Sequence, residues 1–432
     1  MFGVSRGPAP AEPCASAVRF RLRAAACIAG VCYAALSPMT LSAATRSIAY
    51  TLQNPAMMLL AQPGLTTEIN VSTTFGTAAI STTSAANPNI PNIAAYGDSG
   101  NMNRPLTLPT SYSAYRFGDW AVGLTTHSPY TLETMPNNPW AGMFYATDTK
   151  IYTENFTPQV AYQLTSWLSV GAGFQIQGMS ADLSQGFPQS TGSGELNFKG
   201  RALSFGYVLG VNFYPTPRTV LGVGYRSALD QKLEGTVTRA AVPAFAAPAV
   251  SLPASFTFPM PDHVTVTLLH QLTDAWGLLG QFEWLRWSRF GTLPFDVTPT
   301  GVFGLPTALY IPRRNAWAVT AGAEYRWSAD LALRAGVRYD RSAMWDQVRS
   351  PATPVADTIR ALIGFTYEIN DKLSLDVSYV HAFVRHVPIN IAPGYPGYTR
   401  YQGTFSGEAT LGGEIVSVGL RYYWGPLGSG GG

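Results

Sequence analysis

The sequence predicts an all-β fold, a 14-stranded antiparallel transmembrane β-barrel with a short N-terminal hatch. Three observations predict it: an apolar composition without a membrane helix, apolar residues at every second position, and tight turns that alternate with long loops. After residue 60 the same composition and alternating pattern repeat along the chain, with no linker-like change of composition. We therefore expect a single barrel domain over residues 66–424.

The composition excludes a helical membrane protein. Apolar residues make up 46% of the chain and charged residues 12%, and that charged share is about half the roughly 25% usual in soluble domains. No segment approaches the ~20 consecutive apolar residues that a membrane helix needs. The chain is rich in glycine (42), tyrosine (22) and phenylalanine (21), which suits thin strands with aromatic girdles.

The N-terminus has the order of regions found in a signal peptide, which we place at residues 1–43. An apolar run over residues 24–36 is followed by small residues at 41–44, as expected of an h-region and a cleavage site. Three arginines precede the run: Arg19, Arg21 and Arg23. We expect this segment to be removed from the mature protein.

Removal of the leader changes the chemistry of the chain. All three cysteines, Cys14, Cys27 and Cys32, lie in the leader, so we expect none in the mature protein. The leader also holds four arginines and one glutamate, a net charge of +3, which equals the net charge of +3 of the whole chain. The mature protein is then formally neutral and has no basic field for nucleic acid.

Alternation of side chains predicts strands that face lipid. Residues 203–213 place apolar side chains at odd positions and mostly small or polar ones at even positions, and residues 331–340 and 359–368 repeat the pattern. Successive strand residues point to opposite faces, so one face of each strand suits lipid and the other suits a polar lumen. A soluble β-sandwich also alternates, but its strands rarely reach the ~9–11 residues that a bilayer demands.

Six short turns and seven long loops in alternation join fourteen strands. The short turns are expected at 118–119, 164–166, 215–217, 272–274, 328–330 and 370–372, and the long loops at about 82–108, 131–150, 183–199, 238–258, 291–314, 342–357 and 387–410. An even number of strands with short turns on one side is typical of bacterial outer-membrane barrels. We therefore expect the outer membrane of a Gram-negative cell, with both termini in the periplasm.

The C-terminal end fits the same prediction. The last expected strand, residues 415–424, ends on Arg421, Tyr422, Tyr423 and Trp424, which suits an aromatic girdle at the membrane interface. Residues 425–432 are rich in glycine and are expected to form a flexible tail.

Several motifs, taken in order and spacing, resemble the FadL-type outer-membrane transporters of long-chain fatty acids and other hydrophobic compounds. The motifs are Asn54-Pro55-Ala56, the stretch 261–276 that begins Pro261-Asp262-His263, Trp284, Trp287-Ser288-Arg289-Phe290 and the stretch 373–384. The resemblance covers about residues 50 to 424. It implies a barrel plugged by an N-terminal hatch, ligand capture at outer loops, an internal pocket and a sideways exit where the third strand kinks.

Two parts of that mechanism can be placed on this chain. The hatch is assigned to residues 44–65 with Asn54, Pro55 and Ala56 at its centre, and it is shorter than in the family. The kink is assigned to His127, Ser128 and Pro129, because a proline lacks the N–H that a central strand needs. The alternative for Pro129 is that it starts an outer loop.

Charged residues at inward positions are candidate ligand contacts: Arg338, Arg360, Arg226 and Glu283. A guanidinium suits the two oxygens of a carboxylate head group. Charges inside a barrel are also commonly paired into structural networks, and both interpretations stay open. Two loops are apolar enough to offer an entry groove, the second with Trp140, Met143 and Phe144 and the fifth with Val302, Phe303 and Leu305.

The sequence does not predict an enzyme. None of the five histidines sits in a recognisable nucleophile motif. The mature chain has no metal-binding Cys/His spacing and no phosphate loop, so no metal site and no cofactor are expected.

The sequence favours uptake of hydrophobic molecules, with long-chain fatty acids ahead of aromatic hydrocarbons. The expected partners are such a molecule and the surrounding outer-membrane lipid, and we expect a monomer. The alternatives are an aromatic hydrocarbon channel, or a barrel whose loops serve adhesion or structure.

Overall fold

The computed structural model describes residues 23–24, 49–189, 192–241, 248–300, 308–395 and 398–426. The predicted signal peptide lies outside these residues except for Arg23 and Ala24, and so do the first residues of the predicted hatch and residues 427–432 of the predicted tail. Arg23–Ala24 form β1, which pairs in parallel with β15 (Ala308–Tyr310).

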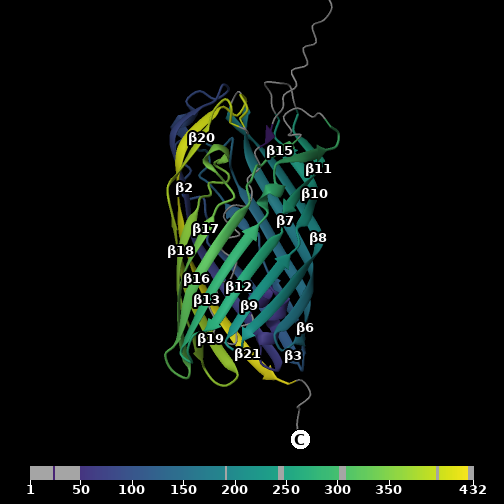
Figure 1. Cartoon of the computed structure of the whole chain (residues 1–432). Helices are drawn as coiled ribbons and strands as arrows, with labels where there is room; N and C mark the ends of the chain where they lie inside the picture. Colours follow the sequence, from purple (N-terminus) through teal and green to yellow (C-terminus); the bar gives the residue numbers. More distant parts are fainter. Residues whose placement is uncertain are drawn as a thin grey trace, which may run out of the picture.

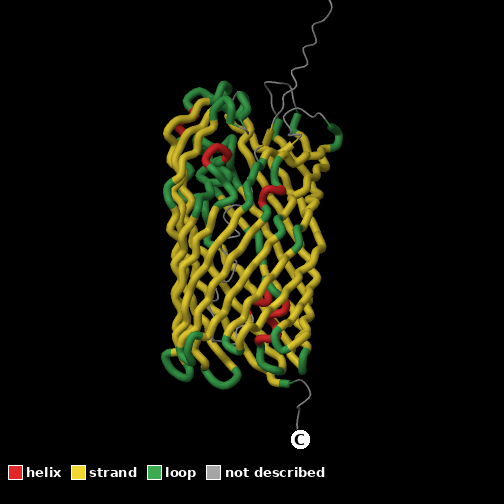
Figure 2. Tube along the Cα trace, in the orientation of Figure 1, coloured by secondary structure: helices red, strands yellow, loops and turns green. Residues whose placement is uncertain are grey.

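Fourteen antiparallel strands form a closed barrel, which confirms the predicted fold class (Figures 1 and 2). The first and last strands pair with each other from Leu65–Gly425 to Ala86–Thr404 and close the wall. The fourteen strands are β2 (Gly64–Ala86), β3 (Leu106–Phe117), β4 (Trp120–His127), β6 (Thr149–Thr165), β7 (Leu168–Gln189), β8 (Gly192–Thr216), β9 (Thr219–Arg226), β12 (His263–Gln271), β13 (Trp276–Leu285), β16 (Ala316–Arg326), β17 (Leu331–Arg341), β18 (Thr358–Glu368), β19 (Leu373–Val384) and β21 (Thr404–Gly425).

The predicted alternation matches the two faces of the barrel wall. Leu203, Val337 and Ile363 are 63%, 56% and 61% exposed, as side chains that face lipid must be. Arg338 and Arg360 lie on the same strands as Val337 and Ile363 but point inward and are buried. The outer face is thus apolar at mid-height while the lumen carries the polar groups.

The six short turns lie where the sequence predicts them, at the end of the barrel that also holds the C-terminus (Figure 1). Three of them share one device, in which a side-chain oxygen accepts from the amide three residues later. Thr273 Oγ1 accepts from Trp276 N at 3.0 Å, Ser328 Oγ from Leu331 N at 3.1 Å, and Asn370 Oδ1 from Leu373 N at 3.0 Å. This capping explains why small polar residues recur in these turns.

Several predicted long loops are wrong in part, because strands continue through them. The segment 183–199 belongs largely to β7 and β8, and further strands extend the opposite end of the barrel: β5 (Leu132–Thr134), β10 (Leu229–Arg239), β11 (Val250–Met260), β14 (Thr292–Val297) and β20 (Val387–Ile391). Their outward positions carry charges, as in the Lys199–Asp182 pair at 3.1 Å and the Lys232–Glu234 pair at 2.7 Å. An apolar lipid-facing pattern therefore cannot reveal these extensions.

Short 3-10 helices account for the helical part of the described residues. They are η1 (Ala49–Leu52), η2 (Pro55–Leu60), η3 (Ile93–Tyr96), η5 (Trp287–Arg289) and η6 (Asp346–Val348). Helices long and apolar enough to cross a bilayer are absent from the described ranges. η1 and η2 lie inside the barrel near its short-turn end (Figure 2).

Two apolar clusters fill much of the lumen toward the long-loop end. The first is built around Trp287, Phe256 and Phe258, and the second around Trp140, Phe144 and Phe405. The predicted groove residues Trp140, Met143 and Phe144 are fully buried in the second cluster. Residues 301–305 of the other predicted groove lie outside the described residues.

Candidate binding site in the barrel lumen

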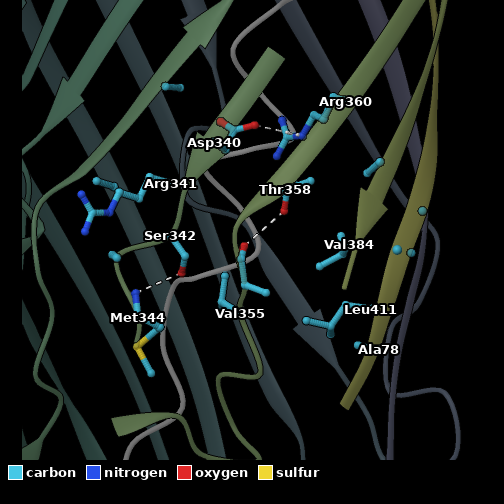
Figure 3. Close-up of a pocket in the computed structure, with 18 of the residues that line it drawn as sticks. Ala78, Asp340, Arg341, Ser342, Met344, Val355, Thr358, Arg360, Val384 and Leu411 are labelled. Atoms are coloured by element: carbon cyan, nitrogen blue, oxygen red, sulfur yellow. Dashed lines mark hydrogen bonds and ion pairs between the residues drawn. The ribbon is translucent and has the colours of Figure 1, made fainter. Parts of the chain in front are cut away.

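A cavity of about 160 Å³ lies between the two apolar clusters (Figure 3). Its walls are mostly apolar and include Leu285, Trp287 and Ala316 from the side of the first cluster. From the side of the second cluster come Ala78, Val384 and Leu411. Strands distant in sequence thus converge on one apolar space, which can hold a hydrophobic group away from water.

The cavity also has a charged end, made by Arg338, Asp340 and Arg360, and Arg341 lines the cavity as well. Arg338 and Arg360 are direct cross-strand partners on β17 and β18. Arg360 Nε lies 3.4 Å from Asp340 Oδ2, an ion pair drawn in Figure 3. Two of the four predicted ligand residues, Arg338 and Arg360, therefore do line this cavity.

Arg338 is fully committed to other protein groups. Its Nε donates to Asp340 Oδ1 at 2.7 Å, and its Nη1 donates to Glu283. Glu283 is buried and also pairs with His263 Nε2 at 3.1 Å. Glu283 thus bridges an arginine and a histidine in the wall, as expected of a structural network.

Arg360 is the less committed of the two arginines. Its Nε lies 3.4 Å from Asp340 but makes no hydrogen bond within the described structure, and the residue is 5% exposed and lines the cavity. A buried guanidinium with free donor capacity is costly unless an acceptor is supplied. Arg360 can therefore receive an anionic group that enters the cavity.

Arg226 lies elsewhere, against the N-terminal segment. Its guanidinium donates to Leu52 O at 2.7 Å, to Asn155 Oδ1 at 3.0 Å and to Gln175 Oε1 at 2.7 Å. The structure thus places Arg226 where it holds η1 to the barrel wall, away from the apolar cavity.

The Asn54-Pro55-Ala56 motif is anchored in the lumen by side-chain hydrogen bonds. Asn54 Oδ1 accepts from Ala56 N at 3.0 Å and caps η2, while Asn54 Nδ2 donates to Asn212 Oδ1 at 2.8 Å and to Val211 O at 3.2 Å. One asparagine therefore both starts the short helix and fixes it to β8.

Glycines in the wall make room for this motif. A Cβ added at Gly210 or Gly222 would collide with the Asn54 side chain, and one at Gly224 would collide with Gln53 O. A Cβ at Gly171 would lie 2.6 Å from Ala56 N. The glycine-rich inner face of β7, β8 and β9 is thus a cradle for the N-terminal segment, since glycine permits close backbone approach.

The wall is interrupted at the predicted kink. β4 pairs with β3 up to Thr126–Ser111 and with β6 up to His127–Asn155, and β5 resumes the pairing with β6 at Leu132–Ile151. Above Ser111 the described part of β3 pairs with β2 alone until the isolated bridge Asn103–Thr134. Ser128 and Pro129 therefore sit beside a stretch of wall without ladder hydrogen bonds.

A small cavity adjoins this break. It has a volume of about 20 Å³ and is lined by His127, Pro129, Tyr130 and Arg226. Such a space has room for about one water molecule. The break is therefore almost filled in this conformation.

An aromatic pair separates the two cavities. Tyr130 lines the small one and Trp287 lines the large one, and their rings meet edge to face with centroids 6.0 Å apart. Sequence reasoning missed Tyr130, although its position beside Pro129 was a usable sign. Among the described residues, no three His, Cys, Asp or Glu side chains are grouped to hold a metal ion.

This closed barrel, with an apolar outer face and a lumen that holds polar networks beside an apolar cavity, has the architecture of an outer-membrane protein. The chain belongs to the family described as "Outer membrane protein transport protein (OMPP1/FadL/TodX)", which it matches over residues 15–422. The predicted family resemblance and outer-membrane location are thereby confirmed.

Relatives agree with this membership. The chain is 24% identical over 339 residues to the "Long-chain fatty acid transport protein" of Escherichia coli strain K12, a match that covers 68% of this chain and 72% of that protein. A FadL homologue of Pseudomonas aeruginosa shares the fold with a TM-score of 0.77 at 23% identity, over 88% of this chain and 94% of the other. The toluene transporter TbuX of Ralstonia pickettii does so with a TM-score of 0.64 at 18% identity, over 87% and 94%.

Proposed function

We propose that this protein takes up long-chain fatty acids across the outer membrane. The ligand is captured at the outer loops, enters the luminal cavity with its carboxylate at Arg360, and leaves sideways at the break near Pro129. The observation that carries the proposal is the apolar cavity with Arg360 at its charged end. A relative named as a fatty acid transport protein supports the same substrate class.

Binding of the carboxylate head group is assigned to Arg360 because the two arginines differ in how many protein partners they have. Arg338 already donates hydrogen bonds to two carboxylates, whereas Arg360 has a single ion pair, from its Nε to Asp340 at 3.4 Å, which does not form a hydrogen bond. A fatty acid carboxylate would supply the missing acceptor in a charge-assisted hydrogen bond. The alkyl chain would lie against Val384 and Leu411.

The exit step rests on the interrupted wall and on the aromatic pair. Movement of Tyr130 away from Trp287 would join the large cavity to the break beside Pro129. The lumen side of the break is almost filled, so passage requires such a movement. Lateral release would deliver an apolar ligand into the apolar layer of the membrane, where it is soluble.

A direct test is the affinity of purified protein for oleate and for oleyl alcohol, which lacks the carboxylate. Arg360→Gln should weaken oleate binding about tenfold, in line with the loss of one charged hydrogen bond, and leave oleyl alcohol unchanged. Arg201→Gln, which removes an exposed arginine from β8, is the matched control. Equal loss of both ligands, or no loss, would contradict the head-group assignment.

A second candidate substrate is an aromatic hydrocarbon. The cavity volume of about 160 Å³ is close to that of an apolar protein cavity of ~150 Å³ that binds benzene. One of the similar structures is a toluene transporter. Uptake of oleate compared with toluene, by one strain that carries or lacks the protein, separates the two substrates. Failure to take up either one would favour loops that serve adhesion or structure.

A further inference from the structure

A third pocket, of about 440 Å³, lies on the outer surface of the barrel beside the long-loop end of β17. Strand alternation places Trp317 and Tyr339 on the lipid-facing side, with ring centroids 5.4 Å apart. Aromatic side chains at this height mark the border between lipid tails and head groups. The pocket therefore lies at the level of the outer-leaflet head groups.

Cations dominate this pocket. Its charged residues are Arg314, Arg341, Arg349, Arg385, Asp346 and Asp357. Arg349 is buried and bound by Asp346 at 2.7 Å, and Arg314 lies 3.6 Å from Asp357. Within the described structure, Arg341 and Arg385 are exposed and form no hydrogen bond or ion pair. Two positive charges are therefore available to an external anion.

These two arginines stand directly above an apolar row. Tyr339, Ile359 and Phe383 are register partners on β17, β18 and β19 and all face outward. Arg341 and Arg385 each follow a member of this row by two residues, one step nearer the long-loop end. The surface thus offers positive charge above and apolar contact below, the order of a phosphorylated lipid in a membrane.

Three lysines elsewhere near this end of the barrel are paired with carboxylates. Lys150 lies 3.3 Å from Glu133, Lys199 lies 3.1 Å from Asp182 and Lys232 lies 2.7 Å from Glu234. Arg341 and Arg385 differ from these lysines in having no carboxylate partner in the described structure, and two such cations above one apolar row suit an anionic lipid.

We propose that this surface binds a phosphorylated glycolipid of the outer leaflet, with a phosphate on Arg341 and Arg385 and an acyl chain along Tyr339, Ile359 and Phe383. Arginine suits phosphate because its guanidinium can donate two parallel hydrogen bonds. The pocket adjoins the luminal cavity, since Trp317, Arg341 and Met344 line both. Arg385 and the outward row of Tyr339, Ile359 and Phe383 line the outer side only, so the lipid site does not depend on which substrate is transported.

The test is native mass spectrometry of the full-length protein in detergent, titrated with bisphosphorylated lipid A. The double variant Arg341→Gln/Arg385→Gln should bind about tenfold to thirtyfold more weakly. The matched control Lys199→Gln/Lys232→Gln removes two exposed cations from the β8 and β10 surface and should bind as the wild type does. Circular dichroism and resistance to detergent unfolding show that each variant is folded.

Two further arms identify the source of the phosphate. Dephosphorylated lipid A should bind the wild type more weakly, and inorganic phosphate at equal concentration should not displace lipid A. Unchanged binding by the arginine variant, equal loss in the lysine control, full binding of dephosphorylated lipid A, or displacement by inorganic phosphate would each overturn the proposal.

Discussion

Neighbouring residues of the same type have different tasks in the lumen wall. Arg338 and Arg360 face each other across β17 and β18, yet Arg338 neutralises the buried Glu283 whereas Arg360 opens onto the cavity. The two side chains have the same guanidinium group, so their chemistry does not explain why one is a structural partner and the other lines the cavity. The positions of the nearby carboxylates explain the difference.

The first prediction concerns these two arginines. Arg338→Gln removes the arginine partner of the buried Glu283, and breaking such a pair costs about 3–5 kcal/mol. Arg360→Gln removes a weaker contact and should change the free energy of unfolding by about 1 kcal/mol or less. Urea unfolding of both variants in detergent micelles measures the difference. Similar losses would show that Arg338 has no special structural role.

A second prediction concerns the glycine cradle. Gly210→Ala places a methyl group against Asn54 and should displace η2, so that the amides of residues 54–61 exchange with solvent faster. Gly178→Ala on β7 is the control, because a Cβ there meets nothing within 4 Å. Hydrogen exchange compares the two variants. Unaltered exchange in Gly210→Ala would mean that the motif does not depend on this contact.

At the scale of elements, the third strand of the barrel is divided into β4 and β5. The four residues between them leave the β3 edge unpaired, and Pro129 cannot donate a ladder hydrogen bond. Tyr130 and Thr131 are instead tied to β6: Tyr130 N donates to Thr153 Oγ1 at 2.8 Å, and Thr153 N donates to Thr131 Oγ1 at 3.1 Å. These hydrogen bonds hold the residues of the break against β6 and leave the edge of β3 without a partner strand there.

The third prediction follows from this arrangement. Pro129→Val restores a backbone donor and a strand-forming residue, so β4 should extend toward β3 and the rate of substrate uptake should fall. Pro294→Val on β14 replaces a strand proline away from the break and should leave uptake unchanged. Uptake by whole cells at equal surface expression is the measurement. An unaltered rate in Pro129→Val would mean that this proline merely begins an outer loop.

At the scale of the whole molecule, the barrel presents short turns at one end and extended strands and loops at the other (Figures 1 and 2). Barrels of this kind insert with the short turns in the periplasm. We therefore expect the extended end to project from the cell surface, and this end carries both the loop segments around η3 and the charged outer pocket.

The fourth prediction tests this orientation. Ala94→Cys in η3 and Ala329→Cys in a short turn are both exposed positions, and the mature chain is expected to have no other cysteine. A membrane-impermeant maleimide on intact cells should label Ala94→Cys and leave Ala329→Cys unlabelled until the cells are lysed. The opposite pattern would show that the barrel has the reverse orientation in the membrane. Labelling of the unsubstituted protein would show that the leader is retained.

The sequence by itself determined the barrel, its fourteen strands, its short turns and the inward position of Arg226, Arg338 and Arg360. These features follow from local rules, since strand alternation and turn chemistry act over a few residues. The sequence did not predict that the strands extend beyond the bilayer, because the outward positions of these extensions carry charged residues, as loops do. The position of Arg226 beneath η1 also did not follow, because its partners are far away in the chain.

Only the tertiary structure decided which groups meet. Closure of β2 on β21 brings Ala78 and Leu411 beside Leu285 and Arg360 in one cavity. The contact of Tyr130 with Trp287 likewise depends on the register of every strand pair between them. So does the difference in hydrogen bonding between Arg338 and Arg360. Alternation assigns each side chain to a face of the wall, whereas the distance between two side chains on one face is set by the whole closed sheet.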